Sequence, residues 1–76
     1  MMNVHIEYCE KWNYGPEFDR VSKIIQIINP NINVKGNQTS PRSGAFEITI
    51  NNDLVYSKFE TNTFPNKEQI KKLLKS

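Results

Sequence analysis

The chain has 76 residues, of which 37% are hydrophobic and 24% charged, and its formal net charge at pH 7 is +2. This length and composition predict one small globular domain over residues 1–76, and the low charge argues against a nucleic-acid partner. One cysteine excludes an intramolecular disulfide and no apolar stretch approaches a membrane span of ~20 residues, so we expect a cytoplasmic protein that contacts no membrane.

The first half of the chain predicts a strand, a helix and a short second strand. Apolar and polar side chains alternate over residues 3–8, as in a strand with one buried face. Pro16 suits the first turn of a helix, and Asn29-Pro30 ends that helix because the residue before proline disfavours α geometry. Alternation over residues 32–35 predicts a second strand that stops at Gly36. The predicted buried stripe of the helix consists of Phe18, Val21, Ile24, Ile25 and Ile28.

The second half predicts a hairpin followed by a short helix. After a polar loop, residues 45–50 and 54–59 alternate, and Asn51-Asn52-Asp53 between them tolerates the positive φ of a tight turn. Asn66, with Gln69 three residues later, predicts a capping-box start for the final helix. Its inward side chains should be Ile70, Leu73 and Leu74.

The predicted order is therefore β-α-β-β-β-α, an α/β chain with the two layers of an α+β domain. A four-stranded mixed sheet with two helices on one face is the simplest way to bury these apolar stripes. The first three elements form a βαβ unit. This arrangement is the core of the thioredoxin-like fold.

Cys9 ends the first predicted strand and lies a short loop before the first helix. Backbone N–H groups at a helix start favour a thiolate, whereas most free cysteines are small buried apolar side chains, and position alone leaves both readings open. His5 and Glu7 share the strand face of Cys9, but structural zinc sites have four ligands. We therefore expect no metal, with these three side chains facing solvent.

Four segments carry a resemblance to a known family. Residues 6–14 resemble the redox-motif segment of the selenoprotein W family, the Rdx family of thioredoxin-like selenoproteins. Residues 43–48 are similar to its Thr-Gly-x-Phe-Glu-Val signature, and residues 54–58 to its Leu-Val/Ile-His/Phe-Ser-Lys strand. Phe64-Pro65 is similar to the Phe-Pro before its last helix, and the second half resembles the branch called migration and invasion enhancer.

The resemblance implies thiol-based redox homeostasis with a Cys-x-x-Sec or Cys-x-x-Cys motif. Its first cysteine corresponds to Cys9, and its selenocysteine or second cysteine corresponds to Trp12. Tryptophan can neither ionise nor attack a disulfide, so the chain cannot run a two-residue dithiol cycle, and whether it is an enzyme stays open. The resemblance also implies that Ser43 and Gly44 face the redox loop and help to bind an extended substrate chain.

Three accounts of Trp12 are open. The natural residue is selenocysteine encoded by UGA, or the protein works through one thiol, or it has lost redox chemistry. In the second account Cys9 forms a mixed disulfide with glutathione or a protein thiol, and no other cofactor is expected. The alternative function is a redox-inactive adaptor that binds a signalling protein. We expect a monomer.

Overall fold

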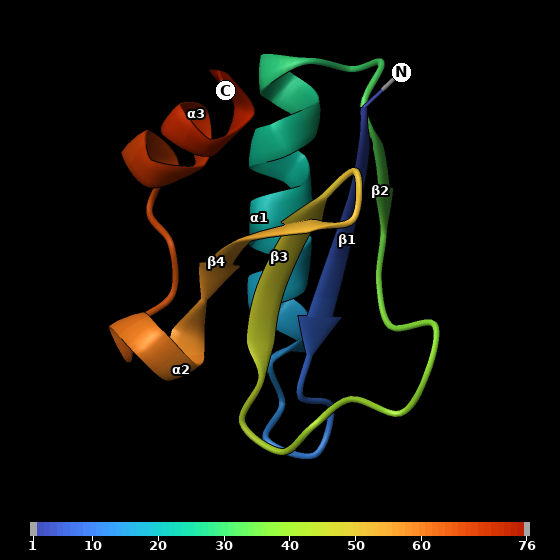
Figure 1. Ribbon diagram of the computed structural model, residues 1–76, viewed down its shortest axis with the longest axis vertical. Helices are drawn as coiled ribbons and strands as arrows, with labels where there is room; N and C mark the ends of the chain where they lie inside the picture. Colours follow the sequence, from blue (N-terminus) through green and yellow to red (C-terminus); the bar gives the residue numbers. More distant parts are fainter. Residues whose placement is uncertain (1, 76) are drawn as a thin grey trace.

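The computed structural model of the protein describes residues 2–75 (Figure 1). Within this range the predicted order of elements is confirmed, with one addition, the single-turn helix α2. The elements are β1 (Asn3–Tyr8), α1 (Gly15–Ile28), β2 (Asn33–Lys35), β3 (Phe46–Ile50), β4 (Asp53–Ser57), α2 (Lys58–Thr61) and α3 (Lys67–Lys75).

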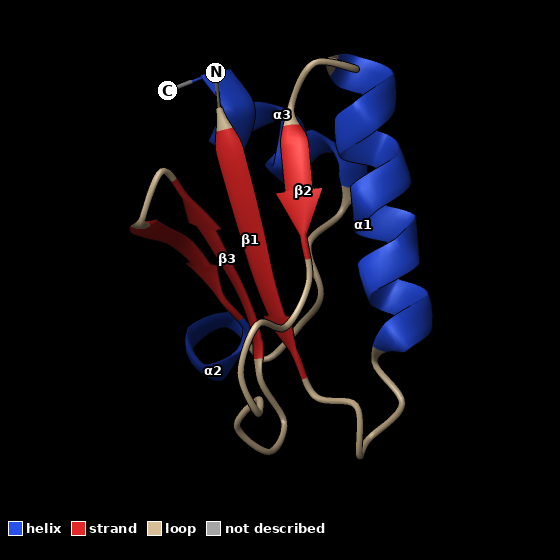
Figure 2. Ribbon diagram, turned by 90° about the vertical axis from the view of Figure 1, so that its right-hand side faces the viewer, coloured by secondary structure: helices blue, strands red, loops and turns tan. Residues whose placement is uncertain are grey.

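The four strands form one mixed sheet in the order β2-β1-β3-β4, as predicted. β1 pairs with β2 in parallel, whereas the β1–β3 and β3–β4 pairs are antiparallel. Helices α1 and α3 pack on each other and on one face of the sheet (Figure 2). No helix within residues 2–75 is long and apolar enough to cross a bilayer.

The core lies between this sheet face and the two helices. Alternate residues of the strands point into it and meet Val21 and Ile25 of α1 and Ile70 of α3, as the periodicity predicted. Ile28 was predicted to complete the buried stripe, but 37% of it is exposed because α3 covers the last turn of α1 only in part. The buried strand residues of this cluster are Val4, Ile6, Phe46, Ile48, Ile50 and Tyr56.

The hairpin turn has the predicted chemistry, but the strand after it is shorter than predicted. Asn51 and Asn52 both have positive φ, 50° and 73°, as a tight two-residue turn requires. The chain then leaves the sheet after Ser57, and Phe59 lies in α2 with 49% of its surface exposed. The buried carboxylate of Glu47 explains the change of direction, because it accepts hydrogen bonds from the Ser57 hydroxyl (2.6 Å) and from the backbone N–H that opens α2 (3.0 Å).

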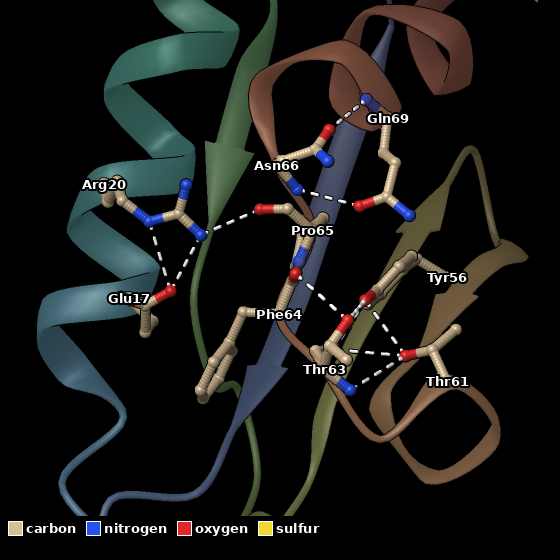
Figure 3. A network of polar contacts seen from close by, with 9 residues as sticks. All are labelled: Glu17, Arg20, Tyr56, Thr61, Thr63, Phe64, Pro65, Asn66 and Gln69. Atoms are coloured by element: carbon tan, nitrogen blue, oxygen red, sulfur yellow. Dashed lines mark hydrogen bonds and ion pairs between the residues drawn. The ribbon is translucent and has the colours of Figure 1, made fainter.

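The predicted capping box of α3 is confirmed (Figure 3). The backbone N–H of Asn66 donates to Oε1 of Gln69, and the N–H of Gln69 donates to Oδ1 of Asn66, both at 2.9 Å. Arg20 of α1 pairs with Glu17 at 2.7 Å and donates to the carbonyl of Pro65 at 2.8 Å. These contacts hold the start of α3 beside α1.

A second polar cluster fixes the chain between α2 and α3 (Figure 3). The hydroxyl of Tyr56 donates to the carbonyl of Thr63, and the Thr61 hydroxyl donates to Tyr56 at 3.0 Å. Asn62 supplies the left-handed residue that ends α2. The segment is thereby tied to β4, and it carries Phe64 into the core.

Candidate functional site

Cys9 lies at the end of β1, and its backbone is bonded on both sides. Its N–H donates to the carbonyl of Ala45 at 2.9 Å, which extends the β1–β3 ladder one residue past the Tyr8–Phe46 pair. Its carbonyl accepts a hydrogen bond from the N–H of Tyr14 at 3.1 Å. Cys9 is therefore held between the sheet and the start of α1.

A tight turn over residues 10–13 follows Cys9. The N–H of Asn13 donates to the carbonyl of Glu10 at 3.0 Å, and Asn13 adopts φ 62°, a conformation that asparagine tolerates better than most residues. Trp12 stands in this turn with 58% of its surface exposed. α1 begins at Gly15 with Pro16 in its first turn, as the sequence predicted.

Cys9 itself is buried, with only 2% of its surface exposed. The prediction that it faces solvent together with His5 and Glu7 is therefore wrong for Cys9, while those two residues are half-buried. Cys9 follows the last residue of β1, and its backbone is bonded to Ala45 on one side and to Tyr14 on the other. Strand alternation alone does not describe a residue at the point where the strand gives way to loops.

Of the two predicted substrate-binding residues, Gly44 lies against Trp12. A β-carbon built on Gly44 would lie 2.9 Å from Cζ3 of Trp12, and Gly44 has φ 75°. A glycine is required here both for the backbone conformation and for the close approach of the indole. Ser43 precedes it in the same loop, and Ala45 follows it fully buried. Figure 1 shows this loop and the turn after β1 together at the lower end of the molecule. A role of Ser43 and Gly44 in binding stays a prediction.

Arg42 binds the loop before β3 to Glu7 on the open face of the sheet. Its backbone N–H (2.7 Å) and Nε (3.1 Å) donate to Oε2 of Glu7, and Nη2 donates to Oε1 at 3.0 Å. Nη2 also lies 3.6 Å from Oε1 of Glu47, and the guanidinium stacks 5.1 Å from the ring centre of Phe59. The hydrogen bonds from Arg42 lower the pKa of Glu7. The sequence analysis missed these contacts of Arg42, because no motif pairs a loop arginine with particular strand carboxylates.

Asn37 was also missed, and it fixes the other side of the loop. Its Oδ1 accepts from the N–H of Tyr8 at 2.9 Å, and its Nδ2 donates to the carbonyl of Tyr8 at 2.8 Å. The Asn37 side chain thus pairs with the backbone N–H and carbonyl of Tyr8 where β2 no longer does. The sequence signal is slight, since Asn37 is one polar residue in a polar loop.

Aromatic side chains connect the turn to the core. Tyr14 lies edge-on to Trp12 at 6.2 Å and edge-on to Phe64 at 4.9 Å, and Phe64 meets Phe46 at 5.2 Å. The ammonium of Lys58 lies over the rings of Tyr14 and Phe64. Tyr14 therefore combines a backbone bond to Cys9 with packing on core residues.

The side chains present limit the chemistry of this site. Residues 2–75 hold no group of three His, Cys, Asp or Glu side chains that could bind a metal ion. His5 lies four residues before Cys9 on the same strand, a separation of about 13 Å, so it cannot serve as a base for the thiol.

Comparisons with known proteins give the family. The Rdx family model matches residues 3–76. Migration and invasion enhancer 1 from Bos taurus is 29% identical over 69 residues, which are 91% of this chain and 58% of the bovine protein, so the chain spans less than two thirds of that relative. Selenoprotein W from Danio rerio is 31% identical over 58 residues, covering 75% of this chain and 67% of the fish protein.

Two solved structures share the fold. A selenoprotein W-related protein from Vibrio cholerae has a TM-score of 0.85 at 21% identity, with 97% of this chain and 92% of that chain covered. A protein from Bordetella parapertussis has a TM-score of 0.83 at 16% identity, with 97% and 94% covered. The family and the fold predicted from the sequence are both confirmed.

Proposed function

The chain belongs to the Rdx family, and from the geometry around Cys9 we propose that it exchanges disulfides through this single thiol. Family membership and fold support a thioredoxin-like, redox-related role. The proposal of disulfide exchange rests on the arrangement of the loop that contains Cys9 and Trp12. Cys9 ends β1, a tight turn leads to α1, and the Gly44 loop packs on Trp12, the position of the second redox residue in the family motif.

The proposed reaction is a monothiol cycle with glutathione or a protein disulfide. The Cys9 thiolate attacks the glutathione sulfur of a protein–glutathione mixed disulfide, a new S–S bond to Cys9 forms, and the protein thiolate leaves. A glutathione thiolate then attacks the disulfide on Cys9, so that glutathione disulfide forms and the Cys9 thiolate leaves. Trp12 takes no part in either step, because an indole carries no exchangeable sulfur.

Access to the thiol requires local opening of the turn over residues 10–13. With 2% of Cys9 exposed, the closed state shields the sulfur from a bulky disulfide. Two backbone hydrogen bonds close the turn, Asn13 N–H to Glu10 and Tyr14 N–H to Cys9. We infer that breaking them lets a disulfide reach Cys9, while the bond between Cys9 and Ala45 keeps the end of β1 in the sheet.

Incubation of the folded protein with glutathione disulfide tests the proposal. Mass spectrometry should detect one glutathione adduct, and peptide mapping should place it on Cys9. The Cys9→Ser variant is the matched control and should gain none. Reduced glutathione should remove the adduct. If no adduct forms while circular dichroism shows native structure, and one forms only in denaturant, Cys9 is a structural residue.

The low exposure of Cys9 and the high exposure of Trp12 also favour a second function. A buried thiol beside an exposed indole is also the arrangement of a binding module, in which Trp12 contacts a partner protein. The adaptor reading predicts that Trp12→Ala abolishes partner capture, while Cys9→Ser leaves it unchanged. The redox reading predicts that capture through a mixed disulfide requires Cys9.

Selenocysteine at position 12 is a further proposal. Trp12 occupies an exposed turn and packs on Gly44 and Tyr14, so the site has room for a smaller residue. The codon for position 12 in the native gene tests this proposal. A UGA codon with a selenocysteine-containing native protein supports the proposal, and UGG rejects it.

A further inference from the structure

A hollow of about 370 Å³ lies between the last turn of α1 and helix α3. Its apolar lining comes from Met2, Ile28, Ile32 and Leu74, and Lys71 and Lys75 form one wall. In Figure 1 the end of α1 and helix α3 lie at the upper end of the molecule, whereas the turn after β1 lies at the lower end. The hollow is therefore separate from the Cys9 loop.

The last turn of α1 exposes unusual apolar surface beside this hollow. Ile27 is 79% exposed, and Ile28 is 37% exposed. Ile28 lines the hollow, and Ile27 precedes it in the last turn of α1. Exposed apolar residues that adjoin an apolar depression mark contact sites more often than isolated ones do.

The charge around the hollow has one sign. No Asp or Glu is among the described residues that line it, and its two lysines stand one helical turn apart on α3, about 6 Å along the axis. Neither ammonium group forms an ion pair with a described residue. The wall therefore presents two positive charges at the spacing of carboxylates four residues apart on another helix.

This charge argues against a second copy as the occupant. A symmetric dimer through this patch would bring Lys71 and Lys75 of both copies, four positive charges, into one interface. Like charges so juxtaposed at an interface oppose association. A concave hollow between two helices instead suits the apolar ridge of a third helix.

We propose that this hollow docks an acidic amphipathic helix of a partner protein. Apolar side chains of the partner enter between α1 and α3 and contact Ile28 and Leu74. Two carboxylates one turn apart, beside that ridge, pair with Lys71 and Lys75. The docking does not depend on the Cys9 thiol, which lies at the other end of the molecule.

A designed peptide tests the proposal on the full-length protein. The probe is a fluorescein-labelled helix of about 16 residues with leucines at i, i+3 and i+7 and two glutamates one turn apart beside them. Fluorescence anisotropy should show saturable binding, and amide NMR shifts should map to the ends of α1 and α3. Cys9→Ser should bind equally, so this result stands whether or not Cys9 exchanges disulfides.

Charge reversal supplies the sharper test. Lys71→Glu with Lys75→Glu should weaken binding of the acidic peptide about tenfold and strengthen binding of a peptide with lysines in place of both glutamates. Lys11→Glu with Lys35→Glu makes the same change in net charge at exposed positions outside α1 and α3 and should leave binding unaltered. Ile28→Asp, at a position that is 37% exposed, should weaken binding similarly, with circular dichroism confirming that the variant keeps its fold.

Several outcomes would overturn the proposal. Equal affinity in both double variants would show that only net charge matters. Peptide-induced shifts confined to the Cys9 loop would place the docking site elsewhere. Binding to anionic phospholipid vesicles without binding to the peptide, or sedimentation showing a dimer broken by Ile28→Asp, would identify a lipid surface or a second copy as the occupant instead.

Discussion

At the scale of single residues, the site depends on how Gly44 meets Trp12. The glycine has φ 75°, and a β-carbon there would lie 2.9 Å from the indole. The family resemblance predicted that Ser43 and Gly44 lie near the redox loop, and the structure places Gly44 against Trp12. The position of Cys9 left open whether its side chain is buried, and in the structure only 2% of it is exposed.

Gly44→Ala should destabilise the protein for two separable reasons. The left-handed backbone costs about 1–2 kcal/mol for a residue with a β-carbon, and the clash with Trp12 adds to this. In a Trp12→Ala background only the backbone cost should remain. Urea unfolding of the wild type, both single variants and the double variant gives the coupling energy. Additive effects would show that the indole does not pack on Gly44 in solution.

The ion pair between Glu7 and Arg42 should make stability depend on pH in the acid range. Its hydrogen bonds lower the pKa of Glu7 in the folded protein below the ordinary value of 4.5. The pair therefore stabilises the fold fully above that value, and its contribution is lost as the pH falls through the lowered pKa. Arg42→Gln should flatten this part of the stability profile, as urea midpoints between about pH 2.5 and 6 would reveal. An unchanged acid slope in Arg42→Gln would assign it to other carboxylates.

At the scale of elements, local patterns predicted most of the fold. The alternation of β1 and β3, the positive-φ asparagines of the hairpin and the capping box of α3 are all confirmed. The predicted end of β4 was wrong because a tertiary contact decides it. Glu47, a polar residue in the alternating segment 45–50, is buried, and its carboxylate accepts hydrogen bonds from the chain where β4 turns into α2. Periodicity does not reveal such a contact.

The capping box of α3 offers a prediction for one element. Asn66→Ala removes the acceptor for the Gln69 N–H and should cost about 1 kcal/mol. For a domain of this size, that loss lowers Tm by about 4–8 °C. Asn66→Ser keeps an acceptor and should retain most of the stability. Calorimetry that finds equal Tm values for the two variants would show that the cap contributes nothing.

At the scale of the whole molecule, the two ends of the domain carry different features. Cys9, Trp12 and Gly44 lie at one end, where loops close over the sheet, and the hollow beside Lys71 and Lys75 lies at the other. The four-stranded sheet and the packed pair α1 and α3 separate them. The proposed disulfide exchange at one end can therefore be tested apart from the proposed docking at the other.

The central claim is that the loop around Cys9 is a redox loop whose second residue has been replaced. The Trp12→Cys variant tests it most directly, because it restores a Cys-x-x-Cys motif in the same turn. In glutathione buffers of graded poise, mass spectrometry should show a reversible disulfide between positions 9 and 12, with native circular dichroism in both redox states. A variant that stays folded yet forms no disulfide, with Cys9 inert to alkylation, would contradict the claim and leave the domain as a binding module.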